Sequence, residues 1–88
     1  MANSNLLSSA CLERGTDYMG NDVGSVQNVA NAKACKQECR DSPRCNFFTF
    51  VRSKKRSGQF FEKGTCFMKH SDEGRRPLKG YVSGSANC

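Results

Sequence analysis

The residues of this chain with the greatest capacity for chemistry are its six cysteines, namely Cys11, Cys35, Cys39, Cys45, Cys66 and Cys88. A cysteine thiolate is a nucleophile or a metal ligand, whereas an oxidised pair of cysteines forms a crosslink. The number is even, and the six span nearly the whole of an 88-residue chain. Such usage is typical of a disulfide framework, which persists in oxidising compartments. We therefore expect a secreted, extracellular protein whose fold is held by disulfides.

Two other uses of the cysteines are weaker predictions. The cysteines between residues 35 and 45 offer thiolates for zinc, with Cys66 or His70 as a further ligand. Structural zinc sites usually show two close ligand pairs, and here the second pair is missing, so we expect no metal. Reduced, buried thiols of a cytosolic protein are the other alternative.

The pairing of six cysteines cannot be read from the sequence alone. Cys35 and Cys39 lie one turn apart on an expected helix, so they point the same way and favour different partners. Cys39 and Cys45 are near enough to staple the helix end to the next segment. A bond between the first and last cysteines would tie the ends of the domain, which leaves Cys35 for Cys66.

The other reactive side chains give no catalytic pattern. His70 is the only histidine, and Asp72 and Glu73 are adjacent on an expected loop rather than opposed across a substrate. Phosphate, dinucleotide and calcium motifs are also missing from the sequence. We expect a non-catalytic protein without a cofactor.

The cysteines must be positioned by a small α+β domain over residues 11–88. Apolar residues make up 36% of the chain, enough for one thin core, and no apolar run approaches the roughly 18 residues of a membrane span. Residues 1–10 are polar and unpatterned, which predicts a disordered leader, linker or non-native tag.

Local signals predict one helix and several short antiparallel strands. Asn31 is a good N-cap and Pro43 disfavours helix before it, which predicts a helix over residues 31–41. The valines between residues 23 and 29 are expected to lead into this helix. The strands are expected around residues 15–22 with a turn, at 46–51 as the buried central strand, at 60–61 and 65–69, and at 80–84.

The order of these motifs resembles the PAN/apple family. The shared features are Thr16-Asp17-Tyr18 after a cysteine, the helical pair Cys35-x3-Cys39, the aromatic strand Phe48-Thr49-Phe50, Cys66-Phe67-Met68-Lys69, and Gly80-x-Val82-Ser83-Gly84 before Cys88. Within that family, the chain looks most similar to the apple repeats of apicomplexan, Eimeria-like microneme adhesins. It departs from the commoner pattern in its long basic segment between Phe50 and Cys66.

The resemblance implies an antiparallel sheet curved around one helix. It also implies the disulfides Cys11–Cys88, Cys35–Cys66 and Cys39–Cys45. Family members are adhesion modules of multi-domain secreted proteins. The implied partner is a host-cell glycan or protein receptor, or another adhesin of the same secretory complex, with storage in micronemes before release.

The charge of the chain, +6 at neutral pH, favours anionic partners. These are sulfated or sialylated glycans, acidic proteins or lipid headgroups; we expect neither nucleic acid binding nor membrane insertion. Tyr18 and Tyr81 are further candidates because sugar sites often include an aromatic face, although half-buried strand positions explain tyrosines equally well. The candidate ligand-binding residues are Arg52, Lys54, Lys55, Arg56, Lys69, Tyr18 and Tyr81.

Four alternatives stay open at this point. The basic residues also fit solvated loops that keep the domain soluble. A small disulfide-rich inhibitor and an anionic-glycan or heparin-binding domain are the other functional classes. A zinc-stabilised nucleic-acid module is the least favoured.

Overall fold

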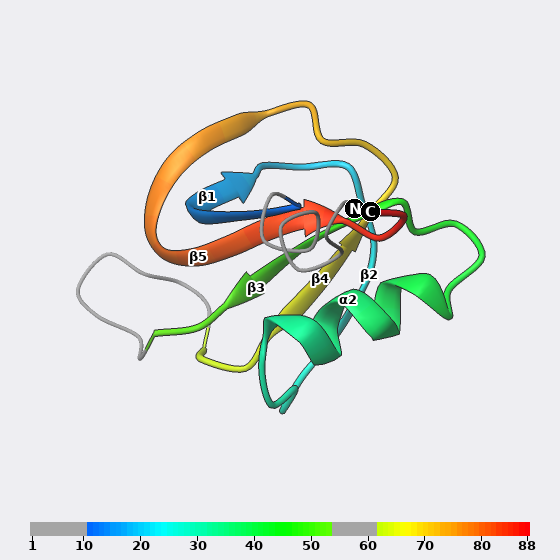
Figure 1. Ribbon diagram of the computed structural model, residues 1–88, viewed down its shortest axis with the longest axis horizontal. Helices are drawn as coiled ribbons and strands as arrows, with labels where there is room; N and C mark the ends of the chain where they lie inside the picture. The colour runs from blue at the N-terminus through cyan, green and yellow to red at the C-terminus, as the bar shows by residue number, and fades with distance from the viewer. Residues whose placement is uncertain (1–10, 54–61) are drawn as a thin grey trace, which may run out of the picture.

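The computed structural model describes residues 11–53 and 62–88 of this chain. These residues form one helix packed against a five-stranded antiparallel sheet, which confirms the α+β prediction (Figure 1). The elements in chain order are β1 (Leu12–Tyr18), β2 (Asp22–Val26), α2 (Ala32–Arg40), β3 (Phe47–Val51), β4 (Cys66–Lys69) and β5 (Arg75–Ser85). No helix within the described ranges has the length and apolar character of a membrane span.

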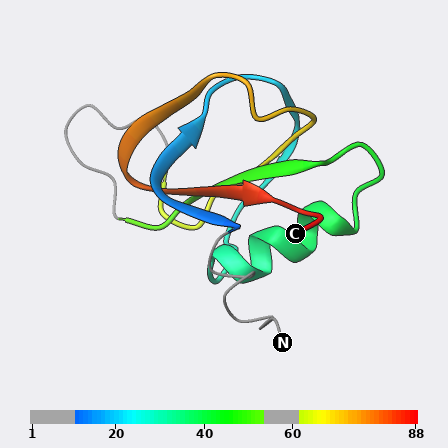
Figure 2. The same cartoon turned by 45° about the horizontal axis from the view of Figure 1, so that its top comes forward.

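The sheet is built around the aromatic strand β3. The strand order is β1-β5-β3-β4-β2, so β3 has a hydrogen-bonded neighbour on each edge. The helix α2 packs against β3, β4 and β5 and covers one face of the sheet (Figure 2). Phe48 and Phe50 pack with the helix cysteines, whereas Thr49 contacts Tyr18 and Ser83. Residues 48–51 are all buried, and the prediction of a central buried strand at residues 46–51 is confirmed.

Two strands differ from the sequence-based prediction. Val23 and Val26, which were expected to lead into the helix, belong instead to the edge strand β2, which pairs with β4, whereas Val29 does lie between β2 and α2. The last strand begins at Arg75 rather than at residue 80, because its first part pairs with β1. Pro77 is tolerated in β5 because β3 pairs with β5 only from Tyr81 onward. The edge of β5 that faces β3 therefore needs no backbone N–H from Pro77. The expected strand at residues 60–61 lies outside the described residues.

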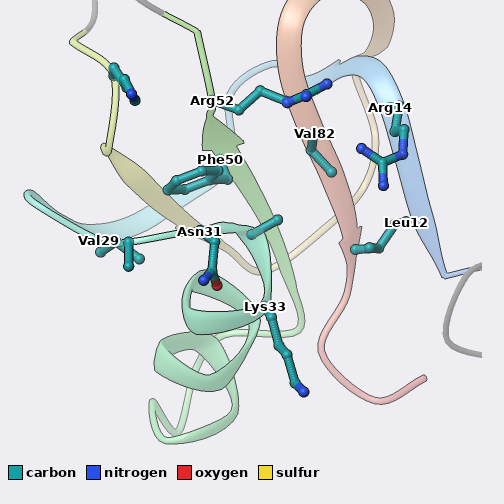
Figure 3. Close-up of a pocket in the computed structure, with 11 residues that line it drawn as sticks. Leu12, Arg14, Val29, Asn31, Lys33, Phe50, Arg52 and Val82 are labelled. Carbon is teal, nitrogen blue, oxygen red and sulfur yellow. The ribbon is translucent and has the colours of Figure 1, made fainter.

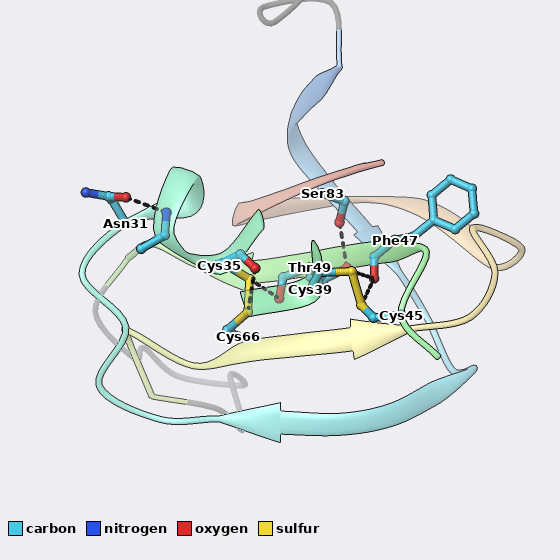
Figure 4. The surroundings of a disulfide bond; sticks show 9 residues. Asn31, Cys35, Cys39, Cys45, Phe47, Thr49, Cys66 and Ser83 are labelled. Carbon is cyan, nitrogen blue, oxygen red and sulfur yellow. Dashed lines mark hydrogen bonds between the residues drawn. A yellow bond between two sulfur atoms is a disulfide. The ribbon is translucent and has the colours of Figure 1, made fainter. Parts of the chain in front are cut away.

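The helix α2 matches the prediction at both ends. The Asn31 side chain accepts a hydrogen bond from the Ala34 N–H at 2.8 Å, and the last helical residue is Arg40. Cys35 and Cys39 are its buried residues, so a sulfur-bearing stripe faces the sheet (Figure 4). The helix is too short to be stable alone, and packing and crosslinks must hold it.

Three disulfides fasten this arrangement. They join Cys11 to Cys88, Cys35 to Cys66 and Cys39 to Cys45, the pairs that the family resemblance implies. One crosslink fixes α2 to β4, one fixes its end to the segment before β3, and one joins the start of β1 to the end of β5. All six cysteines are therefore in disulfides, and while these bonds are intact no thiolate is available for zinc or for catalysis.

A buried hydroxyl relay holds β1 onto the centre of the sheet. The Ser83 hydroxyl donates to the Thr16 carbonyl at 2.8 Å, so the Thr49 hydroxyl donates to Ser83 at 2.6 Å. Thr49 Oγ1 in turn accepts from the Tyr18 N–H at 3.2 Å. Figure 4 shows the central contact between Thr49 and Ser83. Because Thr49 and Ser83 are fully buried, these bonds cannot be replaced by water without a rearrangement.

Candidate functional site

A cavity of about 340 Å³ opens between the start of α2 and the strands β1, β3 and β5 (Figure 3). Its carbon-rich surface comes from apolar side chains of all four elements and of the segment before α2. The apolar lining residues are Leu12, Val29, Ala30, Ala32, Phe50 and Val82. The polar lining residues are Arg14, Asn31, Lys33, Arg52 and Lys63. Four of these five are cations, and no carboxylate is among the lining residues.

The four cations come from separate parts of the chain. Arg14 and Arg52 extend from β1 and from the end of β3 over the same side of the cavity, whereas Lys33 points down the side of α2 (Figure 3). Lys63 belongs to the turn before β4. All four residues are exposed, so a ligand reaches their charged groups from solvent.

Backbone hydrogen bonds fix the positions of Arg52, which follows β3, and of Lys63, which precedes β4. The Arg52 N–H donates to the Gly80 carbonyl at 2.9 Å, which ties the start of the basic segment to β5. The Gly64 N–H donates to the Val51 carbonyl at 2.8 Å, which brings Lys63 back beside β3. Gly64 has a φ of +93°, a left-handed conformation that glycine adopts without strain.

The position of Arg14 depends on an irregularity in β1. The register of β1 against β5 shifts between Arg14 and Thr16, and Gly15 between them has a φ of +67°. Such a bulge re-aims the neighbouring side chains. The nearby Cys11–Cys88 bond holds the start of β1 in place.

The candidate site residues predicted from the sequence fall into three groups according to their location in the structure. Arg52 lines the cavity. Lys54, Lys55 and Arg56 lie outside the described residues. The remaining three are buried: Lys69 is 3% exposed, Tyr18 3% and Tyr81 6%, which leaves little surface for a ligand to contact.

The buried lysine is occupied by its own fold. Lys69 Nζ forms an ion pair with Asp22 at 2.5 Å and donates to the Gly20 carbonyl at 2.9 Å. It also lies 5.4 Å from the centre of the Phe67 ring. A buried charge needs such partners. Lys69 therefore joins β4 to the turn between β1 and β2.

The two arginines at the start of β5, Arg75 and Arg76, are likewise paired with acidic side chains. Arg75 contacts Glu13 at 3.3 Å and Asp72 at 3.0 Å, and Arg76 contacts Asp17 at 2.9 Å. The attraction of Glu13 is the main cause that raises the pKa of Arg75. These pairs offset the positive charge of Arg75 and Arg76, so the first part of β5 attracts an anionic ligand less than the cations of the cavity do.

Tyr18 and Tyr81 have the surroundings of structural residues, because both are buried. Burial, followed by the hydrogen bond from its hydroxyl to Glu13, raises the pKa of Tyr18. The Tyr18 ring packs edge-on against Phe47 at 5.9 Å and lies under the Arg75 guanidinium. Burial is also the main cause that raises the pKa of Tyr81, with Asp17 second.

Sequence reasoning did not select three of the four cavity cations. Lys63 belongs to the basic segment between Phe50 and Cys66, but Arg14 and Lys33 carry no local signal that distinguishes them from other surface cations. Their common property is their place in the tertiary structure, where both line the cavity. Within the described residues, no group of histidine, cysteine, aspartate or glutamate side chains is arranged to hold a metal ion. The chemistry that the cavity offers is binding of an anion.

Comparisons with known proteins agree with this architecture. A family model described as PAN domain matches residues 16–69. Coagulation factor XI of Bos taurus is 34% identical over 61 residues, which cover 69% of this chain and only 9% of the bovine protein. The solution structure of a PAN module from Eimeria tenella matches with a TM-score of 0.59 and 27% identity, over 89% of this chain and 80% of that module. More than half of the sequence thus matches the family model, and the chain belongs to the PAN domain family.

Proposed function

We propose that this PAN domain is a recognition module whose cavity binds an acidic group of an extracellular carbohydrate. PAN domains generally bind proteins or carbohydrates. The observation that carries the proposal is the composition of the cavity, in which four cations surround an apolar floor and no acid lines it. Disulfides persist in oxidising compartments, which is where such a ligand is found.

The cavity has the size and chemistry of a sugar site. Small-molecule sites usually measure about 300–1,000 Å³, and this one is at the small end of that range, as expected for a short piece of a larger ligand. The carbon-lined floor of Leu12, Phe50 and Val82 can pack against the C–H face of a sugar ring. Sulfate or carboxylate groups on that ring would meet Arg14 and Arg52, and arginine binds both groups in a bidentate manner.

The fold supports such binding by rigidity. The elements that carry the cavity are joined by disulfides, so little ordering entropy is lost when a ligand binds. Attachment to host cells, association with another adhesin and microneme storage are finer proposals that rest on the family resemblance alone.

The test is to measure binding of sulfated, carboxylated and neutral oligosaccharides by isothermal titration calorimetry at low and physiological salt. We expect the acidic sugars to bind and the neutral ones to bind weakly. Replacing Arg14 and Arg52 together (Arg14→Ala/Arg52→Ala) should weaken binding about two- to thirtyfold, since each exposed cation contributes about 0.2–1 kcal/mol.

The matched control is Lys79→Ala, which removes an exposed cation of β5 that does not line the cavity. It should change affinity far less than substitution of either arginine. Equal binding by the Arg14→Ala/Arg52→Ala variant and the unmodified domain would overturn the proposal, as would a preference for neutral sugars.

A further inference from the structure

The three disulfides differ in how well solvent reaches them. Both bonds made by the cysteines of α2 join buried residues to buried residues. In the third bond Cys11 is buried, but its partner Cys88 is exposed. A disulfide is reduced when a thiolate attacks one of its sulfurs, so the rate depends on access to that sulfur. A thiol in solution therefore reaches Cys11–Cys88 before the other two bonds.

This exposed bond fastens only the first of two parts of β1. The strand is divided at Gly15, where its register against β5 shifts and where φ is +67°. The first part, residues 12–14, pairs with residues 82–84, whereas the second part, residues 16–18, pairs with residues 75–77. A left-handed glycine between them lets the first part change direction while the second keeps its place.

Buried contacts hold the second part of β1 without help from that bond. The Thr16 carbonyl accepts from the Ser83 hydroxyl at 2.8 Å, and the Tyr18 N–H donates to the Thr49 hydroxyl at 3.2 Å. Both partners are fully buried residues of the central strands β3 and β5. The second part should therefore stay in the sheet when the bond is broken.

The first part of β1 has weaker side-chain contacts. Leu12 and Arg14 extend along the open cavity, and Arg14 is exposed (Figure 3). Glu13 contacts Tyr18 and Arg75, but the Glu13 and Arg75 side chains are 33% and 52% exposed, and ion pairs in such positions contribute little. Apart from strand pairing, the disulfide is the main restraint on this part of the cavity wall.

We propose that Cys11–Cys88 is a redox-sensitive latch on the cavity. Its reduction frees the first part of β1 about Gly15 and removes Leu12 and Arg14 from the cavity wall, while the rest of the domain stays folded. For its effect on ligand binding this inference rests on the proposed function, to which it adds a means of regulation. The reductant is a dithiol, of the class that thiol–disulfide oxidoreductases carry.

The exchange with the dithiol takes two steps. One thiolate of the dithiol attacks the Cys88 sulfur, forms a mixed disulfide with it and displaces the Cys11 thiolate, which takes up a proton. The second thiolate of the dithiol attacks its partner sulfur in the mixed disulfide and displaces the Cys88 thiolate, which is also protonated. The protein gains two electrons and two protons, and the dithiol becomes a disulfide.

The first test asks which bond is reduced. The folded domain is incubated with limiting dithiothreitol, the thiols are alkylated, and the labelled peptides are mapped by mass spectrometry. We expect Cys11 and Cys88 to be labelled about tenfold faster than the cysteines of the other two bonds. Equal labelling of all three pairs, or earlier labelling of the cysteines of α2, overturns the proposal.

The second test asks how far the release extends, by hydrogen exchange of the Cys11→Ser/Cys88→Ser variant. Exchange of the amides of residues 12–14 should accelerate about tenfold or more, whereas residues 16–18 and β3 should change less than about threefold. The matched control, Cys39→Ala/Cys45→Ala, removes a different disulfide and should leave exchange at residues 12–14 unchanged. The latch is refuted by unchanged exchange at residues 12–14, by lost protection throughout the sheet, or by a variant that does not fold.

The third test measures the effect on the site by calorimetry with a sulfated disaccharide. The Cys11→Ser/Cys88→Ser variant should bind it about two- to fivefold more weakly than the oxidised domain, because the contact with Arg14 is lost. Unchanged affinity would refute the regulatory role of the latch. If the oxidised domain binds no acidic sugar, the proposed function fails, whereas the labelling and exchange measurements still decide whether the latch exists.

Discussion

Removal of the Thr49 hydroxyl tests whether the buried relay holds β1 in place. Thr49→Val keeps the shape of the side chain but deletes the group that accepts from the Tyr18 N–H and donates to Ser83. Because β1 carries Leu12 and Arg14 to the cavity, the perturbation concerns both stability and the site. The variant should still fold, with a lower free energy of unfolding.

The expected loss follows from the number of bonds and their burial. Two hydrogen bonds of about 1 kcal/mol each are lost, and a buried N–H left without an acceptor costs about 1–3 kcal/mol. Thr49 and Ser83 are both fully buried, so the upper part of this range applies, and we expect a loss of about 2–4 kcal/mol. For a domain of this size, that corresponds to a decrease in Tm of roughly 10–25 °C.

The assay is a double-mutant cycle measured by urea and thermal unfolding. Thr49→Val and Ser83→Ala remove the same central hydrogen bond, so the double variant should be more stable than additivity predicts, by about 1 kcal/mol. Thr49→Ser retains the hydroxyl and loses only a methyl group, so it should cost about 1 kcal/mol. Additive losses in the cycle, or a Thr49→Ser variant as unstable as Thr49→Val, would refute the relay.

Three further predictions concern crosslinking, ionisation and close packing. Replacing Cys39 and Cys45 by alanine should lower the free energy of unfolding by about 2.4 kcal/mol in urea titrations, because the disulfide closes a short loop of separation 6; no loss would contradict the loop-entropy argument. In the folded protein Tyr18 stays protonated at pH values where the tyrosine of the unfolded chain ionises, so the free energy of unfolding should fall as pH rises above 10.0, by up to about 1.4 kcal/mol per pH unit. Tyr18→Phe should flatten this slope when the free energy of unfolding is measured as a function of pH. Gly84→Ala places a Cβ too close to the Cys11 carbonyl oxygen, so the free energy of unfolding should fall by about 1–3 kcal/mol in urea titrations, and an unchanged value would contradict the close approach of Cys11 to β5.

Elements with local signals could be predicted from the sequence, and elements that depend on a partner strand could not. The helix has its cap in Asn31 and its stop near Pro43, all within one short segment. The first part of β5 contains Pro77 and several charges, so it does not read as a strand; pairing with β1 makes it one. The same holds for β2, whose strand state depends on β4.

The candidate site depends even more on residues that are far apart in the chain. Net charge indicates that an anionic partner is favoured, but it does not say which cations are free to meet it. Lys69 and Arg52 look alike in the sequence, yet one is buried with Asp22 and the other lines the cavity. Burial and ion pairing depend on residues far away in the chain, such as Asp17 for Arg76.

By itself the sequence determined the class of the molecule: an oxidised, cysteine-crosslinked domain with one helix, an aromatic central strand and an excess of positive charge. These properties follow from composition and from interactions between near neighbours in the chain. The tertiary structure alone decided where the charge acts, because the cavity exists only where β1, β3, β5 and α2 converge. Sheet register and disulfides bring Arg14, Lys33, Arg52 and Lys63 together, and no short stretch of sequence contains that information.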